Sequence, residues 1–559
     1  MHALTEGLSP ALPMTLAGER ARHRRLARMM ALPAVLYATA TAIYAWAALQ
    51  VPFAANEGSA YYVAVARNLV TGRGLVTDAL WSFGTPPLTV PRPAFELWQP
   101  LATFVSAAPM TVLGPTLTAA QLGMAALAGL LAPLGWLVAR EAATALGHDQ
   151  RRSAMLAAGT GLLLAVAGPL VLAASLPDST IPFAVAGTAC CWLIARSLAV
   201  QPAKRTQLWL ALGLMLGLAW LARHEAIWIA LVALGVGLGT RSLTPRALAA
   251  AVAGGLLVSG PWLLRNLAAF GSPLPGQALD NAMLTANEQI FGYRHVPSLD
   301  AFLGQGPAAL LGNVAAAAWH NAFSVLLVPA APLAIAGLVG GAVLLWHEPS
   351  LRRGALALLL LSGLAIYAIT TVLFPVATLW GTFEHASGPL VVGLAVAAVL
   401  GVDRAVQAIG RRRRWENSNA WLAPLALTAL TLPLTLLLLA GLASEARQQA
   451  ARYDRLADAL HAVPRLLDGA GPLLTDHPVW LSDATGLPAA ALPAEEPSAV
   501  GELAGRLGAW VVVLTGERGS YPAELESLGG RRCFEVRKVP GAPAGVVVAS
   551  LLAGCRSPW

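Results

Sequence analysis

The stretch VPFAANEGSAYYVAVARNLVTGRGLVTDALWSFGTPPLTVPRPAFEL, residues 51–97, is long and polar, although it directly follows the first apolar segment of the chain. It interleaves Glu57 and Glu96 with aromatic side chains such as Tyr61 and Tyr62. Most of the following chain, up to residue 442, consists of apolar runs of helical length. A polar loop so early in such a chain needs a function. We expect it to form one wall of a site at a membrane surface.

The composition supports a membrane protein. Of 559 residues, 57% are apolar and 12% are charged, whereas soluble domains have roughly 25% charged residues. Apolar runs of roughly 20 residues recur along the chain, which predicts an all-α polytopic membrane protein. The net charge of +8 does not indicate nucleic-acid binding, because the basic residues cluster between apolar runs, as they do in cytoplasmic loops.

The apolar runs predict about 11 to 13 transmembrane helices in residues 29–442. The run at 98–113 is short and contains Pro100 and Pro109, so we expect it to enter from the outer side without a simple full crossing. Twelve runs are recognised, at about 29–50, 98–113, 117–139, 153–175, 181–200, 208–222, 227–239, 247–263, 322–346, 354–373, 389–402 and 421–442.

The distribution of arginine predicts the orientation of these helices. Arginines before the first span and at 411–414 place the N-terminal segment 1–28 and the loop at 403–420 in the cytoplasm. The long loops at 51–97 and 264–321, the short loops at 176–180, 223–226 and 374–388, and the segment 443–559 then lie outside. This orientation requires an odd number of crossings.

Residues 443–559 have a different composition and predict a small extracytoplasmic α/β domain. Short β-type runs at 472–475, 510–514, 533–539 and 545–550 alternate with helical segments near 497–507 and 521–528, which favours a mostly parallel sheet. The domain contains no phosphate-binding glycine motif. Cys533 and Cys555 could form a disulfide if the domain is extracytoplasmic.

Two acids are the leading catalytic candidates. Glu57 follows the first span, where a carboxylate could serve as a general base, although an acid at a helix N-terminus is also favoured by the helix dipole. Asp178 lies between two spans in SLPDST, where it could equally cap the following helix. Glu96, Tyr61 and Tyr62 are candidate substrate contacts in the long first loop.

Three basic side chains on the predicted outer face are candidates for binding a phosphate. Arg223 and Arg265 each lie near the outer end of a span, and guanidinium groups suit bidentate phosphate contacts. Pairing of Arg223 with Glu225, or with a lipid headgroup, is an equal alternative. His385 could orient a substrate or cap the next span.

Taken in order, these motifs resemble the C-type membrane glycosyltransferases that use polyprenyl-phosphate sugars, such as the protein O-mannosyltransferases and aminoarabinose transferases. The resemblance is carried by NEGSAYYVAVARNLVTGRGL (56–75), WQPL (98–101), SLPDST (175–180), GLAWLARHEA (217–226) and PWLLRNLAAFGSPLPG (261–276). The tail motif TDHPVWLSDATGLPAAALP (475–493) is similar to the extracytoplasmic domain of bacterial members.

The resemblance implies transfer of a sugar from a polyprenyl-phosphate donor to a glycan, lipid or protein acceptor at the outer face of a bacterial cytoplasmic membrane. It implies a first-loop acid as general base, with inversion at the sugar carbon. The family has an acidic pair where this chain has Asn56-Glu57, so either Glu57 takes the role, or the alignment shifts by one position, or the protein is catalytically altered. A divalent metal at the acids stays open, although no cluster of ligand spacing is present.

Two other classes of function remain alternatives. A lipid transporter would show inverted repeats and ionisable groups near mid-span, whereas the polar residues here lie at span ends on one side. A non-catalytic membrane protein that binds a glycan or lipid is the other alternative, because Asn56 replaces a family acid.

Overall fold

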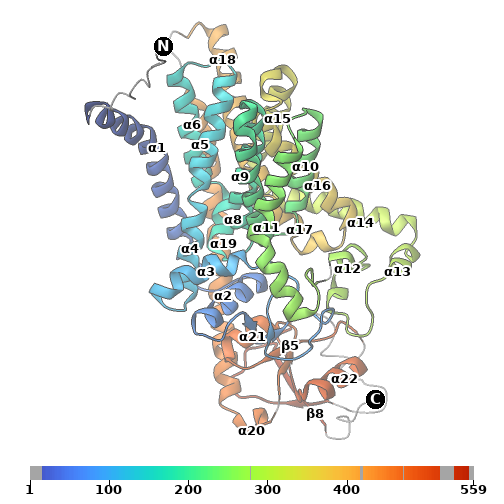
Figure 1. Ribbon diagram of the computed structural model, residues 1–559. Coiled ribbons are helices and arrows are strands. Elements are labelled where there is room, and N and C mark those ends of the chain that lie inside the picture. Colours follow the sequence, from blue (N-terminus) through green and yellow to red (C-terminus); the bar gives the residue numbers. More distant parts are fainter. Residues whose placement is uncertain are drawn as a thin grey trace, which may run out of the picture.

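The computed structural model describes residues 16–276, 278–415, 419–469, 471–495, 497–516 and 534–552. Apolar helices form a bundle, and a small α/β domain lies at one end of it (Figure 1). The bundle helices are α1 (Leu16–Ala48), α4 (Leu117–Ala128), α5 (Leu131–Ala145), α6 (Gln150–Ala165), α7 (Gly168–Ser175), α8 (Thr180–Ala199), α9 (Pro202–Ala222), α10 (Ala226–Gly239), α11 (Pro245–Phe270), α15 (Ala331–His347), α16 (Ala355–Leu373), α18 (Gly388–Arg413) and α19 (Leu422–His461).

The expected polytopic all-α architecture is confirmed. Within the described residues, nine helical stretches are long and apolar enough to cross a membrane, and α6 with α7 forms a tenth candidate bent by 46°. Three further apolar helices are shorter, namely α3 (Leu101–Leu113), α10 and α15. Backbone groups in hydrocarbon must be satisfied internally, which explains why these segments are helical.

Helix α3 lies at the end of the bundle that carries the C-terminal domain, beside α2 (Glu57–Val70) (Figure 1). Its N-cap is Pro100 and Pro109 lies inside it. The described residues include a further candidate span, Pro307–Leu327, which begins inside the predicted outer loop at 264–321. The opposite end of the bundle carries the start of α1 and the end of α18 (Figure 1).

Close packing between α9 and α11 depends on glycine. A Cβ added at Gly213 would lie 2.0 Å from the backbone oxygen of Ala251, and one at Gly217 would lie 2.8 Å from Val258 Cβ. The two backbones can therefore approach only because these positions lack side chains, as the Gly213/Gly217 spacing suggests. Arg223 follows the end of α9, and Arg265 lies near the end of α11.

The second long loop is also largely helical. It contains two helices, α13 (Leu299–Gly304) and α14 (Pro307–Trp319), which are separated at Gln305–Gly306. A π-helical turn, η2, continues α14 toward the bundle. The short elements of this region and the next loop are α12 (Ala278–Ala282), η1 (Asn287–Phe291), α13 (Leu299–Gly304), α14 (Pro307–Trp319), η2 (His320–Leu327), η3 (Pro349–Leu351), η4 (Ala377–Trp380) and α17 (Thr382–Ala386).

The C-terminal domain is built on a six-stranded sheet in the order β2-β5-β4-β6-β8-β7. The four strands from β2 to β6 are parallel, and β8 runs antiparallel to both β6 and β7. Its elements are β4 (Leu473–Thr475), β5 (Ala489–Ala491), β6 (Val511–Leu514), β7 (Phe534–Arg537), β8 (Val547–Leu551), α20 (Pro464–Leu467), α21 (Pro478–Thr485) and α22 (Pro497–Leu507).

One strand of this sheet comes from the first loop and was not predicted. Strand β2 (Ala79–Leu80) pairs in parallel with β5, with Leu80 opposite Ala490. Two further strands of the loop, β1 (Val76–Thr77) and β3 (Arg92–Pro93), pair with each other. The first loop and the C-terminal domain therefore share one sheet, although about 400 residues of sequence separate them.

Several features predicted from the sequence lie outside the described residues. These are the helix near 521–528, the cysteines Cys533 and Cys555, and most of the N-terminal segment 1–28.

The shared sheet generates a test. Leu80 is fully buried, so Leu80→Ala should destabilise the packing by about 2–5 kcal/mol. Because β2 is the edge strand of the C-terminal sheet, we expect the variant to be cleaved faster than wild type by limited proteolysis within residues 443–559. The exposed Thr89→Ala variant in the same loop is the control. Equal cleavage rates in all three proteins would contradict the shared sheet.

Candidate active site at the membrane-domain interface

Helix α2 begins at Glu57, and Asn56 is its N-cap. The Asn56 side chain accepts a hydrogen bond of 2.6 Å from Ser59 N, which satisfies one of the unpaired amides at the helix start. The residue that stands in place of the family acid therefore has a structural role here. Glu57 occupies the first turn, where the helix dipole favours a negative charge.

The Glu57 carboxylate is buried, with 8% of the residue exposed, and it joins the first loop to the C-terminal domain. Oε2 accepts a hydrogen bond of 3.2 Å from the indole of Trp81, and Oε1 accepts one of 3.2 Å from Val479 N. His477 Nδ1 lies 3.4 Å from Oε2. A buried carboxylate requires such partners, because its desolvation is otherwise costly.

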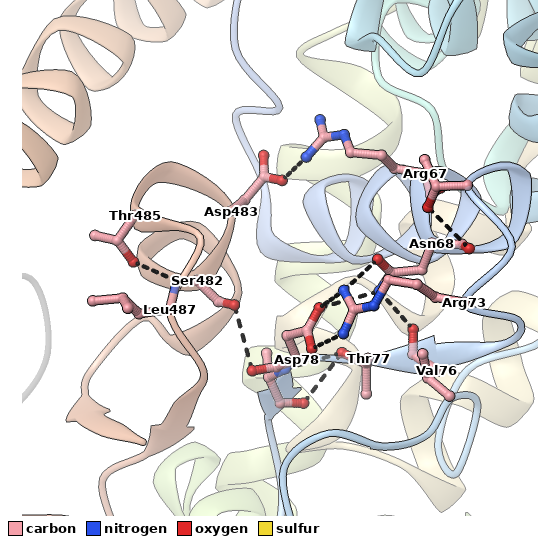
Figure 2. Close-up of polar contacts among 12 residues, drawn as sticks. Arg67, Asn68, Arg73, Val76, Thr77, Asp78, Ser482, Asp483, Thr485 and Leu487 are labelled. Atoms are coloured by element: carbon pink, nitrogen blue, oxygen red, sulfur yellow. Dashed lines mark hydrogen bonds and ion pairs between the residues drawn. The ribbon is translucent and has the colours of Figure 1, made fainter. Parts of the chain in front are cut away.

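Charged contacts flank this junction (Figure 2). Arg67 of α2 pairs with Asp483 of α21. In the first loop, Arg73 pairs with Asp78 at 2.6 Å, and Ser482 Oγ donates to the backbone oxygen of Asp78 at 3.4 Å (Figure 2). The hydrogen bonds from Arg73 lower the pKa of the Asp78 carboxyl. The first loop is thus attached to the C-terminal domain by side-chain contacts with α21 and by the β2–β5 pairing.

Asp178 lies between α7 and α8 and is also buried, with 4% exposed. Its Oδ1 accepts a hydrogen bond of 2.7 Å from Thr180 N, so it does interact with the start of the following helix. Its Oδ2 lies 3.5 Å from His385 Nδ1, and that same nitrogen is 2.8 Å from Thr180 Oγ1. The structure therefore brings together the predicted residues Asp178 and His385, which are 207 positions apart in the sequence.

Arg223 belongs to the same cluster. It pairs with Glu225 at 2.6 Å and donates a hydrogen bond of 2.9 Å to Ser179 Oγ, next to Asp178. The alternative in which Arg223 pairs with Glu225 is thus observed. Burial alone would raise the pKa of the Glu225 carboxyl, but the attraction and hydrogen bonds of Arg223 outweigh it, and this pKa is lowered.

Tyr62 is the first-loop member of this cluster. Burial raises the pKa of its phenol, and the charges of Arg223 and Asp178 also act on it. The candidate residues Asp178, Arg223, His385 and Tyr62 thus form one group at the domain-bearing end of the bundle. We call this group, with Ser179, Thr180 and Glu225, the Asp178 cluster.

Tyr61 and Glu96 lie in a buried network inside the first loop. The Tyr61 hydroxyl donates to Glu96 Oε2 at 3.4 Å and accepts from Phe95 N at 2.7 Å. Arg92 Nη1 lies 3.5 Å from Glu96 Oε1, and both of these charged side chains are almost fully buried. Burial raises the pKa of the Tyr61 phenol. These contacts shape the loop from within.

Arg265 supports the same loop from α11. Its guanidinium donates to the backbone oxygens of Ala94 at 2.8 Å and Leu75 at 3.2 Å. It also lies 4.9 Å from the ring centroid of Trp262, which is a cation–π distance. Arg265 therefore contacts loop carbonyls and not the Asp178 cluster in this structure.

Aromatic rings connect the surroundings of Glu57 with the residues near Arg223. The ring of Trp98 is 4.4 Å from Tyr61 and 4.9 Å from Trp81, whose indole donates to Glu57. Next to Trp98, Gln99 Nε2 lies 2.7 Å from His224 Nε2. Trp98 and Gln99 thus connect the Glu57 side of the site with the residues around Arg223.

Sequence reasoning missed His477 and the Trp81 indole as partners of Glu57. The motif TDHPVWLSDATGLPAAALP (475–493) alone does not assign its histidine a role, because only the fold brings it to α2. For a metal, the described residues contain no group of three or more His, Cys, Asp or Glu side chains placed to bind one.

No protein-family model and no curated protein matches this sequence. Solved structures do match. The apo structure of ArnT from Cupriavidus metallidurans is 18% identical, with a TM-score of 0.50 over 94% of this chain and 99% of that chain. The structure of the same ArnT bound to undecaprenyl phosphate is 16% identical, with a TM-score of 0.51 over the same shares.

The oligosaccharyltransferase of Archaeoglobus fulgidus, in complex with Zn and sulfate, is 13% identical, with a TM-score of 0.53 over 93% of this chain and 75% of that chain. At these identities the likeness concerns the fold. The chain has the fold of C-type membrane glycosyltransferases, as the ordered motifs indicate.

The environment of His224 predicts how the stability of the protein depends on pH. The His224 ring is part-buried, and its Nε2 lies 2.7 Å from Gln99 Nε2. Burial lowers the pKa of His224 accordingly. Below the unfolded pKa of about 6.5 the unfolded chain binds a proton that the folded chain does not. The free energy of unfolding should therefore fall as the pH drops below about 6.5.

We expect His224→Gln to weaken the decrease of the unfolding temperature between pH 7 and pH 5, followed by tryptophan fluorescence in detergent. The exposed His295→Gln variant is the matched control and should keep the wild-type slope. An unchanged slope in the His224 variant would contradict a buried neutral imidazole.

Proposed function

We propose that this protein transfers a sugar from a polyprenyl-phosphate donor to a hydroxyl or amine of a glycan, lipid or protein acceptor. The reaction takes place at the outer face of a bacterial cytoplasmic membrane, with the N-terminus cytoplasmic and the C-terminal domain outside. Residues 29–442 form the membrane domain of the enzyme, and 443–559 form its extracytoplasmic domain.

The observation that carries this proposal is the gathering of buried and half-buried ionisable side chains at one end of an apolar bundle. Asp178, His385 and Arg223 come from three separate parts of the chain, yet they lie within contact of one another or of one intervening residue. Burying charges near a membrane is costly, so such a group favours a functional site. The fold shared with ArnT and oligosaccharyltransferase supports the same class of reaction.

In the proposed reaction, Glu57 is the general base. The acceptor oxygen or nitrogen attacks the anomeric carbon of the sugar, and the bond from that carbon to the phosphate oxygen breaks. The electron pair leaves with the polyprenyl phosphate, and the acceptor proton passes to the Glu57 carboxylate. Asp178, held by Thr180 N and faced by His385, orients the acceptor or sugar.

Arg223 is the best-placed side chain for the donor phosphate. It lies where α9 ends, and its fork of N–H donors suits phosphate oxygens. In the structure its N–H donors bind the carboxylate of Glu225, an anion that takes the place proposed for the phosphate oxygens. The crystal structure of ArnT bound to undecaprenyl phosphate supports a lipid phosphate as the ligand class. His385 is the second proposed phosphate-side group, and Arg265 acts through the first loop.

Asn56 favours one second candidate function, a membrane protein that binds such a lipid or glycan without transferring it. Asn56 caps α2 and carries no carboxylate, and Glu57 is the acid in the first turn of this helix. If Glu57 only joins the domains, the protein binds the donor and does not turn it over.

The test is a transfer assay with purified protein and a polyprenyl-phosphate sugar carrying a radiolabel in the sugar. Incubation with membrane extract as acceptor should move the label from the donor to a new species. Donor binding without transfer would favour the binding protein, and neither binding nor transfer with any polyprenyl-phosphate sugar would overturn the proposal.

Two variants test the assigned acids. Glu57→Gln and Asp178→Asn should each reduce kcat by about 10²–10⁴-fold, because removing a general base or an orienting carboxylate typically has this effect. The exposed Asp300→Asn variant is the control and should keep wild-type activity. Unfolding temperatures are compared to exclude loss of folding. Wild-type kcat in both variants would contradict the mechanism.

A further inference from the structure

His477 lies where the C-terminal domain meets the start of α2, and the proposed function gives this residue no role. It follows β4 and precedes α21, at the carboxyl end of a parallel strand, which is the edge where α/β sheets place ligand-binding groups. Its side chain is 9% exposed, and its Nδ1 faces Glu57 Oε2 at 3.4 Å. The C-terminal domain thus brings an imidazole to the carboxylate proposed as general base.

The backbone around His477 is held on both sides. Before it, Asp476 accepts hydrogen bonds from Thr515 N at 2.9 Å and Thr515 Oγ1 at 2.8 Å, which connects the end of β4 to the end of β6. After it, Trp480 Nε1 donates to the backbone oxygen of Ala54 at 2.9 Å, just before Asn56 and Glu57. The imidazole also lies against the Trp480 ring, with centroids 4.7 Å apart.

The Glu57 carboxylate is therefore bounded by three groups from two parts of the chain. Trp81 comes from the first loop, whereas Val479 N and His477 come from the C-terminal domain. A carboxylate in this setting has one orientation, because rotating it would break at least one of the two hydrogen bonds. Catalytic groups act best when neighbouring side chains hold them in this way.

We infer that the C-terminal domain completes the active site and that His477 is the positioning residue for Glu57. This inference rests on the proposed function. His477 fixes Oε2 and thereby aims the carboxylate at the acceptor, while Val479 N fixes Oε1. The reacting atoms are those of the acceptor, the sugar and Glu57, so the effect of His477 should fall on turnover and not on donor binding.

Three variants of the full-length protein test the inference. His477→Ala removes the contact, and His477→Asn keeps an amide near the place of Nδ1. Asp483→Asn is the matched control, because it breaks the pair between α21 and Arg67 of α2 without touching Glu57. That pair is partly exposed and should contribute little to stability. All three are assayed with the labelled polyprenyl-phosphate sugar.

We expect His477→Ala to lower kcat roughly 100-fold at unchanged KM for the donor, since small misplacements of a catalytic group have effects of this size. His477→Asn should recover a large part of kcat, and Asp483→Asn should behave as wild type. If His477→Ala keeps the kcat of the Asp483→Asn control, or if KM changes and kcat does not, the inference is wrong.

A second measurement separates this inference from the proposed function. If wild type transfers no sugar, the proposed function fails, and the pair is then tested by unfolding temperatures of Glu57→Gln, His477→Ala and the double variant. A double variant less destabilised than the sum of the two supports the coupling of the residues. If the two decreases in unfolding temperature are additive, the coupling of Glu57 and His477 is wrong, whether or not the protein is an enzyme.

Discussion

The structure depends on the docking of the first loop onto the C-terminal domain. Strand β2 has two residues and could not persist alone, but it completes the edge of a sheet whose other strands begin at residue 473. Next to it, the Glu57 carboxylate accepts hydrogen bonds from both sides of the junction. Without this docking, the Glu57 carboxylate would lose Val479 N and His477 and the loop would lose its support, so the site and the domain interface are one feature.

The bundle shows how the apolar environment restricts where charges lie. At the end opposite the C-terminal domain, the fully buried Asp403 pairs with Arg152 and accepts a hydrogen bond from Gln407. These contacts have a structural role, because they compensate a buried charge. At the domain-bearing end, acids, histidines and an arginine come from several segments and meet the aromatic first loop. The second arrangement adjoins the first loop and the C-terminal domain, whereas the first, which also has His148 Nε2 3.8 Å from Asp403, lies away from both.

Much of this could be predicted from the sequence because the signals are local. Apolar run length predicted the helices, the prolines at 100 and 109 identified the segment that lies at the end of the bundle, and the helix at 497–507 was predicted with the observed bounds. The contacts of Glu57 could not be predicted. They depend on His477 and Val479, which lie more than 400 residues away, and on a two-residue strand with no periodicity to detect.

The most direct measurement is a structure of the protein with a polyprenyl phosphate, determined by electron cryo-microscopy in lipid nanodiscs. We predict the phosphate at the Asp178 cluster within contact distance of Arg223, with the ion pair to Glu225 rearranged and the isoprenoid tail leaving between bundle helices. A phosphate found at the opposite end of the bundle, near Arg152, or a map without bound lipid at saturating concentration, would contradict a lipid-linked donor site at this interface.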